Sequence, residues 1–308
     1  MGVAVETREL TKRFGSFTAV NRITMRIEEG EICGIVGPNG AGKSTFIRML
    51  CGILEPTSGS AKVLGFDLAK ETEAIKSRLG YMSQKFSLYE DLSVWENLDF
   101  YAGLYGIPWR ERKRRIEEVI GLAGLSGKER SLVAELSVGW RQRLALGCAI
   151  IGRPSILFLD EPTSGVSPTA RREFFGIIRR MANEGITVLV TTHFMDEAER
   201  CSRVAFISGG ELLAYDTPEH LKASALGGHL VEVEADDPVG AIRRIEKLPF
   251  VRECSMHGRL IHVLLGESSS VEALERSAGA AVRPIAPSLE DVFIALAKRR
   301  REGREVDG

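Results

Sequence analysis

The chain has 308 residues, of which 44% are hydrophobic and 27% charged, a composition typical of a water-soluble globular protein. Its length leaves room for one large domain and one small one. The formal net charge of −1 argues against a protein that binds nucleic acid by bulk electrostatic attraction. We find no apolar run of about 18 residues or more and no signal segment after Met1, so we expect a cytoplasmic protein that neither spans a membrane nor enters the secretory route.

The five cysteines are scattered, and no two of them form a C-x-x-C pair. We expect them to be buried or incidental thiols in a reducing compartment, with no metal site among them.

Residues 3–29 alternate loosely between apolar and polar and are interrupted at residue 15 and at residues 29–30. The pattern predicts short antiparallel strands ahead of the apolar run at residues 32–36. Phe14 falls at the first turn. It could stack on an adenine ring or be a core residue of a small sheet, and this region by itself favours the core.

The apolar run leads into a stretch that fits the pattern G-x-x-x-x-G-K-[ST]. Its residues are Gly37, Pro38, Asn39, Gly40, Ala41, Gly42, Lys43, Ser44 and Thr45. In such a loop the backbone N–H groups turn toward phosphates, Lys43 reaches the β- and γ-phosphates, and the Ser44 hydroxyl ligates Mg²⁺. A helix over residues 46–51 would follow, with its dipole favouring the same anion. The alternative is a glycine turn that binds nothing.

Strands are predicted over residues 61–64 and 79–83, and a helix over residues 71–78. Gln84 leaves the second strand, where it could meet Mg²⁺ or the attacking water, or be a plain surface residue. From residue 92 to about residue 135 the spacing is helical and predicts an all-helical insertion. Its basic run at residues 110–115 fits a solvated helix face better than a contact with a partner or with lipid.

Residues 136–140 precede a helix predicted over residues 141–152. Ser137 is well placed to cap that helix. Alternatively, its hydroxyl and the Gly139 N–H could hold a phosphate presented by another molecule.

The apolar residues 156–159 end in Asp160 and Glu161. Because burying unpaired charge is costly, two carboxylates at the end of a buried strand indicate chemistry. Asp160 would hold Mg²⁺, and Glu161 would polarise the water that attacks the γ-phosphate. A helix over residues 171–183 and a strand over residues 187–192 follow. His193 stands at that strand's end, where ligands gather in open α/β sheets.

Together these motifs resemble the ATP-binding cassette of ABC transporters over roughly residues 3–220. The resemblance rests on residues 37–45, Gln84, residues 136–140, Asp160 with Glu161, residues 164–168 and residues 191–193. Within the family, residues 159–165 and 192–198 look most like the ABC-2 type exporter ATPases, a group that includes multidrug and polysaccharide exporters.

The resemblance implies a P-loop NTPase fold with an antiparallel β subdomain, a parallel-sheet core and a helical insertion at about residues 86–135, all within residues 1–222. It implies ATP and Mg²⁺ as cofactors, with Phe14 stacking on adenine and Gln84 in the loop that couples to the membrane subunit. The catalytic residues would be Glu161, His193, Lys43 and Gln84, and the Mg²⁺ ligands Ser44, Gln84 and Asp160. His193 would contact the γ-phosphate.

The resemblance also implies a head-to-tail dimer, most simply of identical copies. The signature segment Ser137, Val138, Gly139 and Trp140 of one copy would close on the nucleotide held by the other. The family's signature is usually Leu-Ser-Gly-Gly-Gln, so Val138 and Trp140 depart from it. Val138 adds a branched side chain where a positive φ would be costly. Ser167 replaces a usual Asp. We expect hydrolysis to be retained, at an equal or lower rate.

After residue 218 the chemical motifs stop and elements in the order β-α-β-β-α-β follow, which predicts a ferredoxin-like domain over residues 223–298. Its closing helix is expected over residues 289–298, and residues 299–308 are expected to be a charged, frayed tail. Residues 288–293 are similar to the tail of ABC-2 type ATPases. A regulatory or dimer-supporting role and a packing role are both open.

We therefore interpret the chain as an ATPase subunit, peripheral on the inner face of the membrane, that drives a separate integral membrane permease, with no nucleic-acid partner. The coupling surface should involve the Gln84 loop and the helical insertion, near Phe86 to Asp91.

Two alternatives remain. A soluble cassette acting on ribosomes or nucleic acid usually carries two cassettes or a long coiled-coil insertion, and this chain has neither. A non-hydrolysing regulatory cassette is suggested by Val138, Trp140 and Ser167. The intact residues Lys43, Asp160, Glu161 and His193 count against it.

Overall fold

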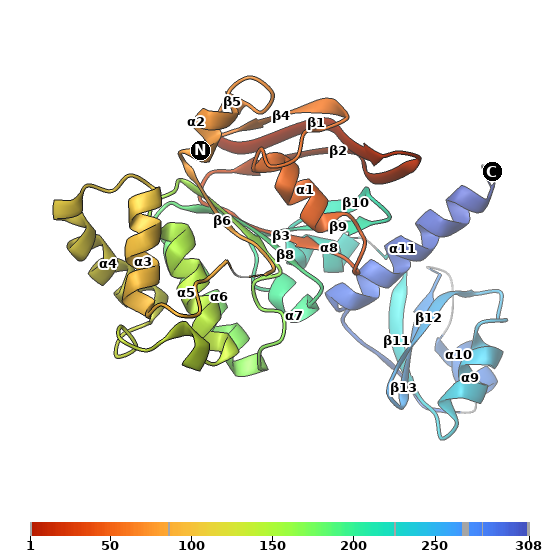
Figure 1. Cartoon of the computed structure of the whole chain (residues 1–308). Helices are drawn as coiled ribbons and strands as arrows, with labels where there is room; N and C mark the ends of the chain where they lie inside the picture. Colours follow the sequence, from red (N-terminus) through yellow and green to blue (C-terminus); the bar gives the residue numbers. More distant parts are fainter. Residues whose placement is uncertain (1, 86, 225, 267–270, 279, 307–308) are drawn as a thin grey trace. The chain divides into compact units, whose positions relative to one another are not determined.

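The computed structural model describes residues 2–85, 87–224, 226–266, 271–278 and 280–306 (Figure 1). The chain divides into two compact units, Met1–Tyr215 and Asp216–Gly308. The sequence predicted a boundary after residue 222, whereas helix α8 (Pro218–Ser224) belongs to the second unit. Phe86, which was predicted to lie near the coupling surface, falls outside the described residues.

An antiparallel sheet opens the first unit. Its strands, in the spatial order β2-β1-β4-β5, are β2 (Phe17–Glu28), β1 (Val3–Phe14), β4 (Ser58–Val63) and β5 (Phe66–Asp67). The first two strands have 12 residues each and are longer than the short strands predicted. Their pairing contains several register shifts. Each shift interrupts the two-residue alternation by which a strand is recognised in sequence, so the prediction broke them up.

A six-stranded sheet forms the centre of the first unit (Figure 1). Its spatial order is β10 (Glu211–Asp216), β9 (Arg203–Ser208), β3 (Ile32–Val36), β8 (Thr187–Thr192), β7 (Ile156–Asp160) and β6 (Leu79–Met82). The pairs from β9 to β6 are parallel, and β3, β7 and β8 are buried along their whole length. Such strands read as continuous apolar runs because both faces are covered. Their carboxyl ends all meet at one edge.

Three helices of the first unit begin three residues earlier than the sequence predicted, at Lys43, Val138 and Pro168, whereas the helix predicted from residue 71 begins at Thr72. The helices of this unit are α1 (Lys43–Leu50), α2 (Thr72–Lys76), α3 (Val94–Leu104), α4 (Trp109–Ala123), the 3₁₀ turn η1 (Val133–Glu135), α5 (Val138–Ile150), α6 (Pro168–Asn183) and α7 (Met195–Ala198). Apolar spacing marks the interior of a helix and not its first turn, which capping groups define. Ser167 shows the reason for α6: its hydroxyl accepts a hydrogen bond from the Ala170 N–H at 3.3 Å, and Pro168 follows as the first helical residue.

Helices α3 and α4 form the helical insertion and pack on each other and on α5. Ser93 and Glu96 make a reciprocal capping box at the start of α3, and Gly124 ends α4 in the left-handed region. Among the described residues, every helix is too short or too polar to cross a bilayer.

The second unit has the predicted β-α-β-β-α-β order. Its elements are β11 (His229–Glu234), α9 (Pro238–Ile245), β12 (Val251–His257), β13 (Leu260–Leu265), α10 (Val271–Ala278), β14 (Val282–Pro284) and α11 (Leu289–Val306). The strands pair antiparallel in the order β12-β13-β11-β14, as a ferredoxin-like fold requires. The prediction of a frayed tail from residue 299 was wrong, because α11 continues to Val306.

The five cysteines lie in buried or half-buried environments that make their thiols unreactive. Cys33, Cys51, Cys148 and Cys201 are buried and Cys254 is half-buried. Burial raises the pKa of the Cys33, Cys51 and Cys148 thiols, and it raises the pKa of Cys201 and Cys254 to about 12. Since the thiolate is the reactive form, we expect Ellman's reagent at mildly alkaline pH to label the folded chain very slowly and all five cysteines after unfolding. Fast labelling of the folded chain would contradict this burial.

Candidate active site

Four motifs meet at the carboxyl edge of the parallel sheet. The loop with Lys43 follows β3, Gln84 follows β6, Glu161 follows β7, and His193 follows β8. These strands are neighbours in the order β3-β8-β7-β6. Ligands bind at this edge in open α/β sheets. The sheet therefore brings together residues that are as much as about 150 positions apart in the chain.

Two glycines of the phosphate loop, Gly37 and Gly42, leave no room for a side chain. A Cβ on Gly37 would lie 2.0 Å from the Ile207 carbonyl oxygen. Gly42 has φ +101°, and a Cβ there would lie 2.3 Å from the Ala19 carbonyl oxygen. The loop backbone is therefore packed directly against other backbone, with the amides of the turn continuing into α1.

A cavity of about 370 Å³ opens beside the loop. It is lined by Phe14, Phe17, Ala19, residues 39–45, Gln84 and Glu161. Phe14 and Phe17 are 50% and 62% exposed, and the Lys12 Nζ lies over the Phe14 ring, 5.3 Å from its centroid. An exposed aromatic pair next to a phosphate loop suits a planar base. The sequence singled out Phe14 and missed Phe17, although both lie at the turn between β1 and β2.

Lys43 is buried, with its side chain 3% exposed. Its Nζ donates to the carbonyl oxygens of Gly37 at 2.8 Å and Pro38 at 3.1 Å, and it forms an ion pair with Glu161 Oε1 at 3.1 Å. The lysine is thus held in a fixed position by the loop itself. A phosphate in the cavity could take the place of Glu161 as its anionic partner and leave that carboxylate available for a water.

Asp160 links the loop to the central sheet. Its Oδ1 accepts hydrogen bonds from the Ser44 hydroxyl at 2.7 Å and the Thr191 hydroxyl at 2.9 Å. Its Oδ2 is buried and has no hydrogen-bond partner among the described residues. A buried carboxylate oxygen needs a compensating donor or cation. The Ser44 hydroxyl and Asp160 supply the hard oxygen ligands that Mg²⁺ prefers, so these residues fit that ion.

Glu161 sits at the centre of the site in an unusual backbone conformation. Its φ is +48°, a region that costs free energy for a residue other than glycine and that is concentrated at functional sites. The Gln84 Nε2 donates to its Oε2 at 3.2 Å, and His193 Nδ1 lies 3.6 Å from the same oxygen. Glu161 therefore contacts two other predicted site residues, Gln84 and His193, in addition to Lys43.

Comparison of the sequence with known protein families and proteins agrees with this geometry. The family described as ABC transporter matches residues 20–164. A protein of Escherichia coli named "Probable multidrug ABC transporter ATP-binding protein YbhF" is 49% identical over 221 residues, which are 72% of this chain and 38% of that protein. The Nod factor export ATP-binding protein I of Rhizobium etli is 32% identical over 303 residues, covering 97% of this chain and 95% of that protein.

The chain belongs to the ABC transporter ATPase family. A solved structure of the ATP-binding cassette MJ0796, described as a dimeric post-hydrolysis state bound to ADP and Pi, superimposes with a TM-score of 0.64. It is 25% identical, and the match covers 69% of this chain and 98% of the MJ0796 chain. The cassette fold predicted from the motifs is therefore confirmed. The chain spans 38% of the length of YbhF and nearly all of the Nod factor export protein.

In this ABC cassette, His193 lies beside the Glu161 carboxylate, and one nitrogen of its ring makes no hydrogen bond among the described residues. Its side chain is 33% exposed, and its ring lies 4.0 Å from the Phe194 ring. The Nδ1 atom is buried without a hydrogen-bond partner among the described residues. A phosphate oxygen near this nitrogen would supply that partner, as the sequence predicted for His193.

The signature segment forms the N-terminus of α5 instead of a loop ahead of it. Ser137 is the N-cap residue, and its hydroxyl makes no capping hydrogen bond. Val138 is helical and 44% exposed, so the expected cost of a positive φ at this position does not arise and that concern was wrong. Trp140 lies under the cations of Lys128 and Arg143, at 5.7 and 5.1 Å.

Within the part of the chain that the structure describes, none of the signature residues lines the cavity beside the phosphate loop. A single copy therefore does not bring the signature segment to its own loop. A Cβ on Gly139 would have its nearest neighbour 3.8 Å away, so the helix start is open. An open helix N-terminus with free amides suits an anion presented from outside.

The sequence missed Thr191 as a site residue. Its hydroxyl donates to Asp160 Oδ1 and accepts the Glu161 N–H at 2.8 Å, so one side chain positions both carboxylate residues. Thr191 sits opposite Asp160 in the parallel pairing of β7 and β8. The signal in the sequence was its place in residues 191–193, which carry part of the family resemblance but gave Thr191 no role of its own.

A second network of buried polar side chains lies after strands β7 and β8, near the same carboxyl edge of the parallel sheet. Glu197 is fully buried and accepts a hydrogen bond from the Thr163 hydroxyl, and Arg171 Nε lies 3.3 Å from its Oε1. Burial raises the pKa of Glu197, opposed by the hydrogen bonds from Thr163 and Thr192 and by the Arg171 charge. Arg171 also stacks over Phe194 at 3.5 Å. The network ties the segments after β7 and β8 together.

Proposed function

We propose that the chain binds ATP with Mg²⁺, hydrolyses it as a head-to-tail dimer, and drives a separate membrane permease that exports a substrate. The observation that carries this proposal is the cluster of Lys43, Ser44, Asp160 and Glu161 at one sheet edge, joined by contacts of 2.7 to 3.1 Å. Each of the four has a role in phosphoryl transfer that needs its residue type.

The adenine would lie against Phe14, and Phe17 adds a second exposed aromatic side chain. The triphosphate would follow residues 37–45, whose amides and Lys43 bind its charge. Mg²⁺, when bound by Ser44 and Asp160 with Gln84 nearby, would neutralise charge on the β- and γ-phosphates. Glu161 then accepts the proton of the attacking water, while Gln84 and His193 orient the groups beside it.

The partner cassette would complete each site. Ser137, Val138, Gly139 and Trp140 of one copy would face the γ-phosphate held by the other, since they form a helix start away from their own loop, with Ser137 and Val138 exposed. The solved MJ0796 cassette is dimeric, which supports this arrangement. Ser167, which replaces the usual Asp, caps α6 and would make a weaker contact across the dimer.

Export through a permease at the inner face of the membrane is supported by the names of the relatives, which are a multidrug transporter protein and a Nod factor export protein. The insertion also exposes an apolar group suited to a partner. Its members are Tyr89, Phe100, Leu104, Tyr105 and Trp109, which are 37% to 79% exposed. Next to Tyr105 lies a cavity of about 220 Å³ that Tyr81, Ser87 and Tyr101 also line. A group of exposed apolar residues is typical of an interaction site.

The test is affinity purification of the tagged chain from detergent-solubilised native membranes, with every co-purifying chain identified and its stoichiometry measured. We expect a polytopic membrane protein in comparable amount. Phe100→Arg, which places a charge in the apolar group, should lose that protein. The matched control Ile53→Arg, at a residue 57% exposed elsewhere in the first unit, should retain it.

Recovery of ribosomal or nucleic-acid-binding proteins alone would overturn the permease assignment. Absence of ATP turnover with the membrane protein present would instead favour the non-hydrolysing regulatory cassette.

A further inference from the structure

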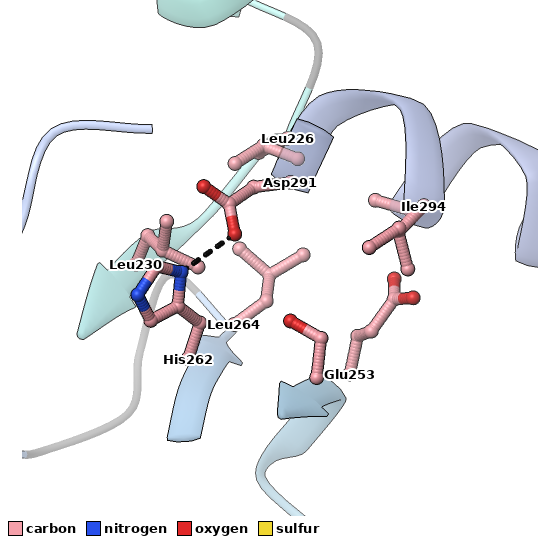
Figure 2. Close-up of a pocket in the computed structure, with 9 residues that line it drawn as sticks. Leu226, Leu230, Glu253, His262, Leu264, Asp291 and Ile294 are labelled. Carbon is pink, nitrogen blue, oxygen red and sulfur yellow. Dashed lines mark hydrogen bonds and ion pairs between the residues drawn. The ribbon is translucent and has the colours of Figure 1, made fainter. Parts of the chain in front are cut away.

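The sheet of the second unit has one apolar face and one face that carries polar groups. Val231, Val233, Ile261, Val263 and Leu265 point into the core with α9 and α10. The alternate residues on the same strands point the other way. They include Glu232 on β11 and His262 on β13, which are directly opposite each other in the register. Helix α11 lies over this second face, as its residues line a pocket there with Leu230 and Leu264 (Figure 2).

Three metal-ligating side chains meet under the start of α11. His262 pairs with Ser255 on β12, and His257 lies two residues further along β12 on the same face. Figure 2 shows the carboxylate of Asp291, from the first turn of α11, directed at the His262 ring. The distance from His262 Nδ1 to Asp291 Oδ1 is 2.7 Å, and that from His257 Nε2 to the same oxygen is 3.7 Å.

The spacing of these atoms fits one metal ion. One ligand atom from each of His257, His262 and Asp291 can be chosen so that all three lie within 4.8 Å of one another. Around a tetrahedral ion with bonds of about 2.1 Å, ligand atoms lie about 3.4 Å apart. The two measured separations differ from that value by less than about 1 Å, which side-chain rotation can supply. The imidazole rings are stacked, 19° from parallel with centroids 4.0 Å apart, so one ring must rotate before both nitrogens point at the same ion.

The groups around the three ligands are arranged as a metal site requires. Glu232 Oε2 lies 3.5 Å from His262 Nε2, which would fix the tautomer that leaves Nδ1 free as a ligand. Glu232 is itself held by Arg283. The N–H and the hydroxyl of Ser288 both donate to Asp291 Oδ2, at 2.9 and 2.6 Å, so the other oxygen is left facing the histidines. The side chains of His262 and Asp291 are 15% and 3% exposed.

We propose that His257, His262 and Asp291 bind a divalent transition-metal ion of the Zn²⁺ class. The bound ion links the start of α11 to the β12–β13 hairpin. Two imidazole ligands exclude a Ca²⁺ or Mg²⁺ site, which takes oxygen ligands, and the absence of a thiolate among the three argues against Cu(I). The fourth position is open to water, beside the Ser255 hydroxyl at 3.1 Å from His257 Nε2.

The experiment uses the full chain, purified with a tag free of histidine and in excess Mg²⁺ to occupy oxygen-donor sites. Co²⁺ titration followed by visible absorption, and Zn²⁺ titration against a chromophoric chelator, give stoichiometry and affinity. We expect one tight Zn²⁺ per chain, the visible bands of a Co²⁺ ion with nitrogen ligands, and a rise in melting temperature with Zn²⁺. His257→Gln should weaken binding at least about tenfold, since even the loss of a group that only orients a metal ligand costs that much.

His220→Gln is the matched control, because His220 is 63% exposed and its only ion-pair partner within the described residues is Asp216, at 3.7 Å. It should bind Zn²⁺ as the unaltered chain does. Asp291→Asn, which keeps the shape of the side chain, provides a second ligand variant, and the melting curve without metal reports whether each variant folds. Equal Zn²⁺ affinity in the unaltered chain and His257→Gln, or no stoichiometric binding at all, would overturn the site. Neither result depends on ATP turnover, so the proposal stands or fails apart from the transport function.

Discussion

Replacing Glu161 with glutamine is expected to lower ATP turnover about 10²- to 10⁴-fold, the usual effect of losing a general base. Glutamine has nearly the same shape and keeps an oxygen within reach of Lys43 Nζ, which lies 3.1 Å from the present carboxylate. It cannot accept the proton of the attacking water. ATP binding should therefore persist and the chain should accumulate as an ATP-bound dimer. Phosphate release and size-exclusion chromatography with ATP measure the two effects.

The matched control is Glu184→Gln, at an exposed residue that follows α6. It should turn over ATP at the unaltered rate. Rapid turnover in the Glu161 variant would remove Glu161 from its proposed role, and the neighbouring groups at the sheet edge would have to supply the base.

Replacing Lys43 with alanine is expected to weaken ATP binding at least about 10- to 100-fold, in contrast to the Glu161 change. A hydrogen bond to a charged group contributes about 1.5–3 kcal/mol, and each 1.4 kcal/mol is about tenfold in affinity. The variant also removes the bonds to the Gly37 and Pro38 carbonyls and leaves Glu161 buried without its cation. Calorimetric titration with ATP and Mg²⁺ measures the affinity, and a thermal melt reports whether the loop still folds.

Lys76→Ala is the control for the loss of a lysine, because Lys76 is exposed on α2 and pairs only with Glu73 among the contacts that the structure describes. It should bind ATP normally. If Lys43→Ala bound ATP as tightly as Lys76→Ala, the loop would not be holding phosphate through that side chain. Together, the Glu161 and Lys43 variants separate the chemical step from binding.

Local features of the fold were predictable because they depend on neighbouring residues. The phosphate loop is a continuous stretch, and its glycines, lysine and serine each act through residues a few positions away. The buried strand that ends in Asp160 and Glu161 was recognisable because four apolar residues precede two carboxylates. The order of elements in the second unit was recognisable for the same reason.

Helix starts and strand lengths were less predictable. Apolar spacing marks the middle of a helix, whereas caps such as Ser167 define its start. The register shifts between β1 and β2 interrupt the alternation of apolar and polar residues, so the two 12-residue strands could not be recognised as continuous from the sequence. At Val138, the concern about a positive φ assumed a loop, and the helix begins there instead.

The sequence by itself determined the phosphate loop and the two acidic residues, since each consists of contiguous residues with a recognisable spacing. Together with the other motifs, they also determined the cassette family. Only the tertiary structure decided that Thr191 holds Asp160 and Glu161 together, and that His257 and His262 meet Asp291 beneath α11. The physical reason is register. Asp160 faces Thr191, and Glu232 faces His262, because of how particular strands pair, and strand pairing depends on packing between segments far apart in the chain.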